Sequence, residues 1–233
     1  EIFEQPSALR RLISQGKAEI VNVAAEVRAR APQYVFIAAR GTSDNAGRYA
    51  SYLWGAANRL PVALATPSLF TFYDAAPALK GALVMGISQS GQSPDIVSVV
   101  AEGRRQGAMT LSLVNVVDSP LAQSSDRVID IRAGKESAVA ATKTYTAELM
   151  AIAMLSCAMT PEMPERWAEI ARVPDWAEEV LRLDGEIQRL AERFRFMERC
   201  VVLGRGFNYA TAFEWSLKLK ELTYLVAEPY STA

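Results

Sequence analysis

Residues 82–94, Ala-Leu-Val-Met-Gly-Ile-Ser-Gln-Ser-Gly-Gln-Ser-Pro, contain the pattern that decides the fold. The apolar run over 82–88 predicts a buried strand, because it is short and carries no charge. A polar turn follows, and Ser93 before Pro94 marks the start of a helix, since serine suits the N-cap and proline the first helical position. A strand that passes through a short turn into a helix is typical of a parallel α/β sheet.

The same alternation extends in both directions along the chain. Apolar runs predict further strands, and amphipathic stretches between them predict helices. We therefore expect an α/β fold, a doubly wound parallel flavodoxin-like sheet over residues 31–160, preceded by an N-terminal helix within 1–30. The other expected strands are 34–39, 61–66, 109–114 and 127–131, and the expected helices are 7–30, 44–58, 68–73, 94–106 and 142–159.

The remaining third of the chain begins with a cluster of prolines, Pro161, Pro164 and Pro174, which favours a boundary. We expect a helical linker over 161–195, with its main helix at 175–195. The run 200–206 then repeats the layout of 35–41, an apolar strand followed by Arg-Gly. This repetition predicts an incomplete second domain over 196–233, with one strand and one helix, the helix continuing toward Glu228.

Composition excludes several classes of function. Half of the 233 residues are hydrophobic and the formal net charge is −1, which suits a globular protein and disfavours nucleic-acid binding. The absence of histidine rules out a Ser-His-Asp triad and the usual zinc sites, so we expect no metal and no cofactor. Cys157 and Cys200 are expected to be buried reduced thiols. The longest apolar run, 147–159, carries Glu148 and is too short for a bilayer, so we expect a cytoplasmic protein without a membrane segment.

The turn after the third expected strand has the composition of an anion site. The start of a helix offers free amides and a positive dipole end, and Ser88, Ser90 and Ser93 add hydroxyl donors. Gly91 allows the backbone to approach a ligand closely. In doubly wound folds ligands bind at this edge of the sheet. A serine-rich helix cap without any ligand is the alternative interpretation.

Two other turns repeat this logic at the same edge. The first is Arg40-Gly41-Thr42-Ser43-Asp44 and the other is the segment 137–142. No Gly-Lys-Ser/Thr motif is present, so a nucleoside triphosphate is not indicated. Gly204-Arg205-Gly206 is only a weak dinucleotide motif, because Tyr209 stands where the third glycine belongs.

The last expected helix places three charged residues, Glu214, Lys218 and Glu221, on one face, since they are four and three positions apart. A carboxylate beside an ammonium group can transfer protons next to a carbonyl. Ordinary ion pairs on a solvated face explain the same spacing, and the spacing by itself favours that interpretation.

Taken together, these segments resemble the sugar isomerase (SIS) family, and most closely the isomerase half of glucosamine-6-phosphate synthase and its relatives without a glutaminase half. The similarity extends over nearly the whole chain in order. It is carried by Glu1-Ile2-Phe3-Glu4-Gln5-Pro6, Gly41-Thr42-Ser43, Ser88-Gln89-Ser90-Gly91, Val139-Ala140-Ala141-Thr142-Lys143, Leu217-Lys218-Leu219-Lys220-Glu221 and Ala227-Glu228.

The resemblance implies two SIS domains, a homodimer and a 6-phosphosugar as the small-molecule partner. It implies that the phosphate is held by Ser88, Gln89, Ser90 and Ser93, with help from Thr42, and that Ser43 also belongs to the substrate site. It also implies that Val139 and Ala141 line the sugar, and that Lys218 and Glu221 transfer protons between C1 and C2, with Glu221 as the base.

The implied activity is aldose–ketose isomerisation coupled to amination or deamination at C2, without a glutaminase. Two departures affect this expectation. Ala141 replaces a serine of the synthase, and the family's ring-opening histidine and Schiff-base lysine would lie beyond Ala233. We therefore expect a piece of a longer protein, or a chain that is not catalytic by itself. A regulatory module that binds phosphosugar without turnover and a fructosamine-phosphate deglycase are the alternatives.

Overall fold

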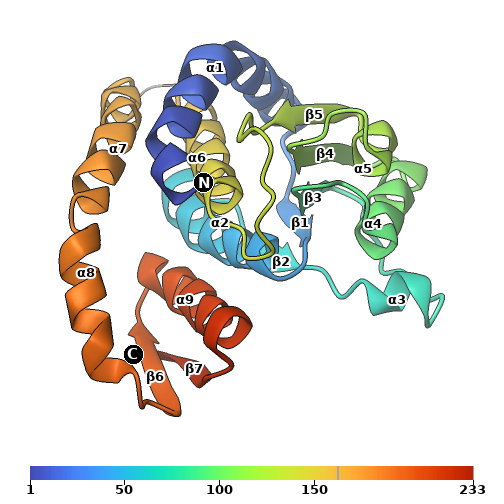
Figure 1. The fold of residues 1–233 in the computed structure, drawn as a ribbon. Coiled ribbons are helices and arrows are strands. Elements are labelled where there is room, and N and C mark those ends of the chain that lie inside the picture. Colours follow the sequence, from blue (N-terminus) through green and yellow to red (C-terminus); the bar gives the residue numbers. More distant parts are fainter. Residues whose placement is uncertain (162, 233) are drawn as a thin grey trace.

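A parallel five-stranded sheet forms the centre of the molecule (Figure 1). The structure is a computed structural model that describes residues 1–161 and 163–232. The strand order is β2-β1-β3-β4-β5, the order expected for a flavodoxin-like sheet. The strands are β1 (Tyr34–Ala38), β2 (Val62–Leu64), β3 (Ala82–Ser88), β4 (Met109–Val114) and β5 (Arg127–Asp130).

Helices cover both faces of this sheet, so the predicted doubly wound fold is confirmed (Figure 1). One face carries α1 (Gln5–Arg30), α2 (Thr42–Asn58) and α6 (Lys143–Ala158), and the 3-10 turn Ile2–Glu4 precedes α1. The other face carries α3 (Ser68–Thr71), α4 (Pro94–Arg105) and α5 (Pro120–Ser124). Sequence analysis missed α5, which is only five residues long.

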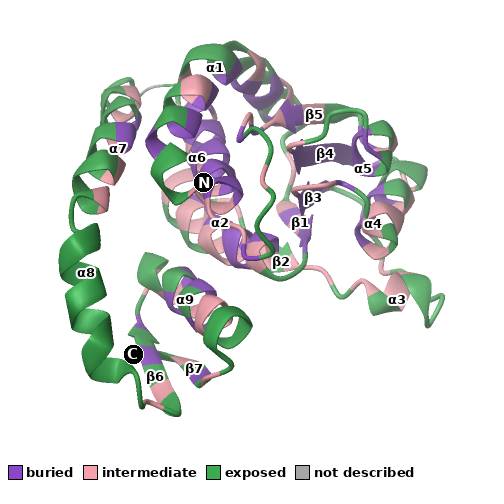
Figure 2. Cartoon of the chain, viewed as in Figure 1, coloured by how far each residue is buried: buried purple, intermediate pink, exposed green. Residues whose placement is uncertain are grey.

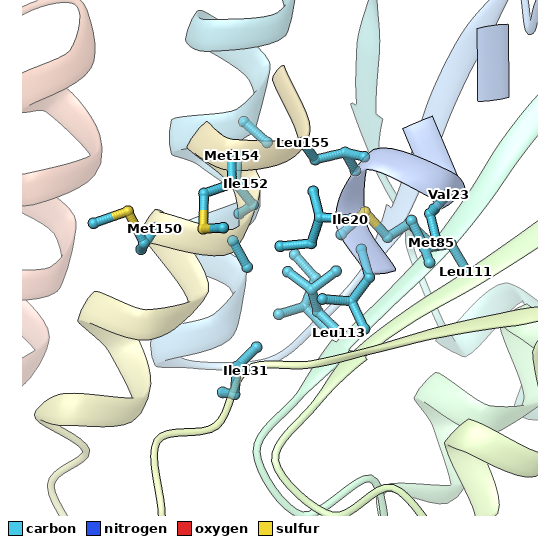
Figure 3. Packing of buried hydrophobic residues seen from close by; sticks show 14 of the residues in the cluster. Ile20, Val23, Met85, Leu111, Leu113, Ile131, Met150, Ile152, Met154 and Leu155 are labelled. Atoms are coloured by element: carbon cyan, nitrogen blue, oxygen red, sulfur yellow. The ribbon is translucent and has the colours of Figure 1, made fainter. Parts of the chain in front are cut away.

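The larger core lies between the sheet and the α1–α2–α6 layer (Figure 3). Met85, Leu111 and Leu113 point from the strands toward Ile20 and Leu155 of the helices, and all five side chains are fully buried. Burial of each such side chain stabilises the fold by about 1.5–3 kcal/mol. This core fixes the carboxyl ends of β1 and β3, which pair in register up to Ala38 and Gly86. The turns that follow these two strands are therefore held side by side.

The chain then leaves the sheet through α7 (Glu165–Leu181) and α8 (Asp184–Ala191), followed by the 3-10 turn Glu192–Phe194. The expected helix over 175–195 is wrong in two respects. Pro174 lies inside α7 and does not mark a boundary, and the helical segment is interrupted at Arg182 and Leu183. Figure 2 shows α8 exposed along its whole length, and none of its residues is buried. Arg182 and Leu183 are both good helix formers, so the sequence gave no signal of the break that precedes α8.

The C-terminal segment folds as a strand–helix–strand unit, made of β6 (Arg199–Gly204), α9 (Phe207–Thr223) and β7 (Val226–Ser231). The two strands form a separate parallel pair. The expectation of one strand and one helix is therefore wrong, because Glu228 lies in β7 and the helix ends at Thr223. Tyr224 has a left-handed backbone, which ends α9 and turns the chain into the strand. The helix α9 packs against α2 and so joins the unit to the sheet domain.

Two further expectations concern single residues and the membrane. Cys157 is buried, as expected, and burial raises the pKa of its thiol, but Cys200 in β6 is only half-buried. Both thiols are free. Across the parts of the chain that the structure describes, none of the helices combines the length and apolar character that crossing a bilayer requires.

Candidate functional site

The serine turn, residues 88–93, connects β3 to α4 at the carboxyl edge of the sheet. The Ser88 hydroxyl is buried and accepts a hydrogen bond from the Gly91 amide at 3.1 Å. Ser90 accepts one from the Gln92 amide at 3.3 Å. These bonds fold the turn on itself and hold its serines at the start of α4, where the helix dipole favours an anion.

Gly91 is required for this turn. Its φ of +63° lies in the left-handed region, and a Cβ atom here would come within 2.1 Å of Ser119 Oγ. Ser93 occupies the predicted N-cap position with an extended backbone. Within the described chain its side chain makes no capping hydrogen bond, so its hydroxyl remains available to a ligand.

Gln89, also in the serine turn, lines a cleft of about 520 Å³. Three cationic side chains, Arg11, Arg132 and Lys135, line the same cleft. The cleft therefore joins one end of the predicted phosphate site to a region of positive charge, partly offset by carboxylates. Its residues come from α1, the serine turn, the turn after β4, and β5 with the segment that follows it.

The turn after β1 leads into α2 and is tied to the first turn of α4, directly after the serine turn, by an ion pair between Arg40 and Asp95. Its two hydroxyl residues face different partners. Ser43 is buried, and its Oγ is hydrogen-bonded to Glu148 Oε1 of α6 at 2.8 Å. Thr42 is half-buried and contacts α9. The first turn of α2 therefore connects the sheet domain to the C-terminal unit.

Glu148 has an unusual environment for a carboxyl group. Its side chain is fully buried, and among the described residues its Oε2 atom has no hydrogen-bond partner. The pKa of Glu148 is raised to about 8, mainly by burial and also by the nearby carboxylates Glu214 and Glu136, against the opposing effect of the Ser43 hydrogen bond. At neutral pH this group therefore carries its proton.

Glu214 of α9 is the second buried carboxylate, and it is well paired. It accepts hydrogen bonds from Thr42 Oγ1 at 3.0 Å and from Asn45 Nδ2 at 2.8 Å, and Lys218 Nζ lies 3.3 Å from its Oε1. Two donors come from α2 and one from α9. Glu214 therefore holds the two helices together at the point where Thr42 begins α2.

Lys218 connects this junction to Glu221. Its ammonium group donates to Thr42 Oγ1 at 2.9 Å and to Glu221 Oε2 at 2.8 Å. Glu221 is exposed, whereas Lys218 is half-buried. Lys218 and Glu221 therefore form an ion pair, and Thr42 links it to the turn that follows β1.

The segment between β5 and α6 carries Val139 and Ala141. Val139 is 99% exposed and Ala141 is half-buried. The segment is fixed by Glu136, whose carboxylate accepts hydrogen bonds from the amides of residues 142–144 at the start of α6. Although burial opposes the change, these bonds, with the Thr142 hydroxyl, hold the pKa of Glu136 below its ordinary value. Lys143, almost fully buried, pairs with Glu4.

The structure brings Thr42 and Ser43 together with Lys218 and Glu221, and it places the serine turn on the neighbouring strand. Sequence analysis did not identify Glu148, Asn45 or Glu136 as site residues, and it noted Glu214 only for its spacing. For Glu148 a signal existed, since it is a single carboxylate within the apolar run of α6. Among the described residues, His, Cys, Asp and Glu side chains form no cluster able to hold a metal ion.

Comparison with known proteins identifies relatives of this arrangement. The family model described as "SIS domain" matches residues 29–158. The chain is 34% identical over 230 residues to the glutamine–fructose-6-phosphate aminotransferase (isomerizing) of Aquifex aeolicus. That alignment covers 99% of this chain and 38% of the Aquifex protein, so the chain spans about two fifths of this relative.

Solved structures agree with this relationship. A protein from Silicibacter pomeroyi DSS-3, provisionally assigned as a phosphosugar isomerase, has a TM-score of 0.92 and 39% identity. The C-terminal domain of glucosamine-fructose-6-phosphate aminotransferase from Francisella tularensis has a TM-score of 0.87 and 30% identity. Each comparison covers 99% of this chain, and 69% and 68% of the respective structures.

Proposed function

The chain belongs to the SIS domain family, and from this premise we propose that it binds a 6-phosphosugar and isomerises it between aldose and ketose, with amination or deamination at C2. Its relatives include enzymes named for fructose 6-phosphate. One observation carries the proposal. Lys218 donates to both Thr42 and Glu221, and this supports a role for the two charged residues in proton transfer beside the carboxyl edge that carries the serine turn.

The serine turn is the proposed phosphate site. Ser88, Gln89, Ser90 and Ser93 would surround the phosphate at the positive end of α4. Contacts to the phosphate lie at the far end of the sugar from C1. Binding energy from that end therefore orients the open-chain sugar without taking part in bond breaking. Ser43, from the neighbouring turn, is proposed to donate to the same phosphate.

Glu221 is the proposed base. For a ketose substrate it would take a proton from C1 and return it to C2 through an enediol or enolamine intermediate. Lys218 is 2.8 Å from Glu221, close enough to stabilise the carboxylate and to exchange protons with the oxygen at the reacting carbons. Val139 and Ala141 are proposed to line the sugar. A homodimer and a cytoplasmic location are also proposed, on the family resemblance.

The phosphate assignment is tested by calorimetric titration with fructose 6-phosphate and glucosamine 6-phosphate. The Ser88→Ala and Ser90→Ala variants are expected to weaken binding at least about tenfold, because each removes a donor to a charged ligand. Ser124→Ala is the matched control, since its hydroxyl bonds only to the Pro120 carbonyl on the surface of α5. Unchanged affinity in both turn variants would refute the phosphate site.

The catalytic assignment is tested by following ammonia released from glucosamine 6-phosphate and the interconversion of aldose and ketose phosphates. Glu221→Gln is expected to lower the rate by a factor of about 10² or more without a comparable loss of binding. A Glu221→Gln protein that turns over as fast as the parent would exclude Glu221 as the base. Binding by the parent without any turnover would favour a regulatory module.

A further inference from the structure

Glu148 lies where an ionised carboxylate would have no cationic partner of its own. It lies on α6, fully buried, with Oε1 hydrogen-bonded to Ser43 Oγ at 2.8 Å and Oε2 without a partner among the described residues. A buried ionised carboxylate that is paired with one neutral hydroxyl is costly, because the solvation that it loses is not replaced.

The groups around Glu148 do not neutralise it. Two are carboxylates, Glu214 on α9 and Glu136 before α6, and a third is the phenol Tyr145 on α6, which has the phenol Tyr49 of α2 near it. Two described cations lie where α2 meets α9: Lys218 pairs with Glu214 and Glu221, and Arg48 pairs with Asp44. Burial raises the pKa of Tyr49 and of Tyr145 above the ordinary phenol value, so neither phenol ionises near neutral pH.

We propose that Glu148 is a positioning residue that works as a neutral acid, donating its proton to Ser43 Oγ so that the Ser43 hydroxyl can donate to a phosphate oxygen. The inference rests on the proposed function, in which Ser43 contacts the phosphate. Glu148 itself does not touch the ligand.

A hydroxyl group has one hydrogen, and this limits what Ser43 can do. An ionised Glu148 can only accept hydrogen bonds, so the Ser43 hydroxyl donates its single hydrogen to Glu148. The Ser43 oxygen then presents only lone pairs to the phosphate dianion. When Glu148 is protonated it donates to Ser43, whose hydrogen is then free for the ligand. The heavy-atom separation of 2.8 Å suits both directions, so the charge on Glu148 decides which one forms.

This arrangement makes phosphosugar affinity depend on pH in a defined window. The pKa of Glu148 is raised to about 8 in the free protein. Below pH 8 the acid is neutral and Ser43 is a donor. Above pH 8, Ser43 presents only lone pairs to the phosphate, and the ionised Glu148 places a buried negative charge directly behind Ser43. The phosphate of the ligand has a second pKa of about 6, so the ligand remains mainly a dianion from pH 7 upward.

The first test measures the dissociation constant of fructose 6-phosphate by calorimetry from pH 7 to pH 9.5, for the parent and for Glu148→Gln and Glu148→Leu. The parent is expected to lose about tenfold in affinity across this range. Glu148→Leu, which removes the hydrogen bond that orients Ser43 Oγ, should bind about tenfold more weakly than the parent at pH 7. Glu148→Gln should restore most of that loss, because its amide donates an N–H to Ser43, and its affinity should not change with pH.

The second test needs no ligand. Carboxyl carbon NMR of the free protein should show a glutamate titrating near pH 8, and this signal should be missing in Glu148→Gln. This readout keeps the inference testable if the leucine variant fails to fold. If the signal that is missing in Glu148→Gln titrates near pH 4 to 5 in the parent, the inference is overturned.

The outcomes separate this inference from the proposed function. If the parent binds fructose 6-phosphate and Glu148→Gln retains the same dependence on pH, the role of Glu148 is refuted and the phosphate site stands. If the parent binds no sugar phosphate while Glu148 still titrates near pH 8, the proposed function is refuted, and the assignment of Ser43 as a phosphate donor falls with it.

Discussion

The segments β1–α2–β2 and β6–α9–β7 have the same backbone design. Val35 pairs with Val62 and Arg199 pairs with Val226, at the same separation in sequence. In each segment the helix is preceded by Arg-Gly, and the two glycines have nearly equal backbone angles, φ 53° and ψ −124° at Gly41 and φ 58° and ψ −129° at Gly206. Both helices have 17 residues.

The surroundings of the two segments differ. Trp54 of α2 is fully buried, whereas Trp215 of α9 is 61% exposed. Val201 and Leu203 of β6 are also more than half exposed, although the corresponding strand β1 is buried in the sheet domain. The comparison teaches that local sequence is enough to set this turn and helix. A core forms only where other elements cover the unit.

The chemistry of the two segments is complementary. In α2 the polar groups of the site lie in the first turn, at Thr42 and Ser43. In α9 the matching positions are Phe207 and Asn208, and the charged residues come later in the helix. The packing of α9 on α2 brings these two sets together, so each segment supplies what the other lacks.

The largest expected effect tests the difference in burial. Trp54→Ala should lower the free energy of unfolding by about 3–5 kcal/mol, because it removes a large buried side chain and leaves a cavity. Trp215→Ala should lower it by about 1 kcal/mol or less, since most of that side chain is already in water. Urea denaturation of both variants measures the difference. Equal losses would mean that α9 is covered in solution as thoroughly as α2.

The second effect concerns Glu148, whose carboxyl group is hydrogen-bonded to Ser43 in the first turn of α2. The folded protein holds the Glu148 proton up to about pH 8, whereas the unfolded chain releases it near pH 4.5. The raised pKa of Glu148 therefore contributes its full stability to the folded state below pH 4.5. This contribution is lost as the pH rises from 4.5 to about 8, by up to about 1.4 kcal/mol per pH unit. Glu148→Gln cannot titrate, so its stability relative to the parent should increase from pH 5 to pH 8. Parallel stability curves for the two proteins would contradict this.

The third effect tests the likeness of the two turns. Gly41→Ala and Gly206→Ala should each cost about 1–3 kcal/mol, because a side chain at these backbone angles is strained even where space is open. Gly55→Ala is the control, since Gly55 is helical and a Cβ atom there meets no neighbour, and it should stabilise by about 0.5–1 kcal/mol. Thermal unfolding measures all three. A cost at Gly41 without one at Gly206 would break the comparison.

The smallest effect concerns the junction of the two segments. Thr42→Val should destabilise by about 1 kcal/mol, because it removes a hydroxyl that Lys218 and Glu214 share while those two groups remain paired with each other. Thr71→Val is the control, since its hydroxyl bonds only within α3. Chemical denaturation compares them. A loss no larger than that of the control would show that the Thr42 hydroxyl does not couple the helices.

Much of the architecture could be predicted from the sequence. The five strands of the sheet domain were located within two residues, because buried parallel strands are short apolar runs between turn residues. The position of the serine turn could be predicted because it follows the apolar run of β3 and because Ser93-Pro94 marks the start of a helix. The strand β7 was missed because it contains Glu228 and Pro229 and follows a helix without any glycine or proline to end it. The break before α8 was missed because Arg182 and Leu183 are both good helix formers.

The sequence by itself determined the order of strands and helices, the positive end of α4 beside its serines, and the spacing that puts Glu214, Lys218 and Glu221 on one face. These features depend on neighbours along the chain. The tertiary structure alone decided that Thr42 meets Lys218 and that Ser43 meets a buried Glu148. Those contacts join residues more than a hundred positions apart, and the charge on Glu148 depends on how completely the packed helices exclude water from it.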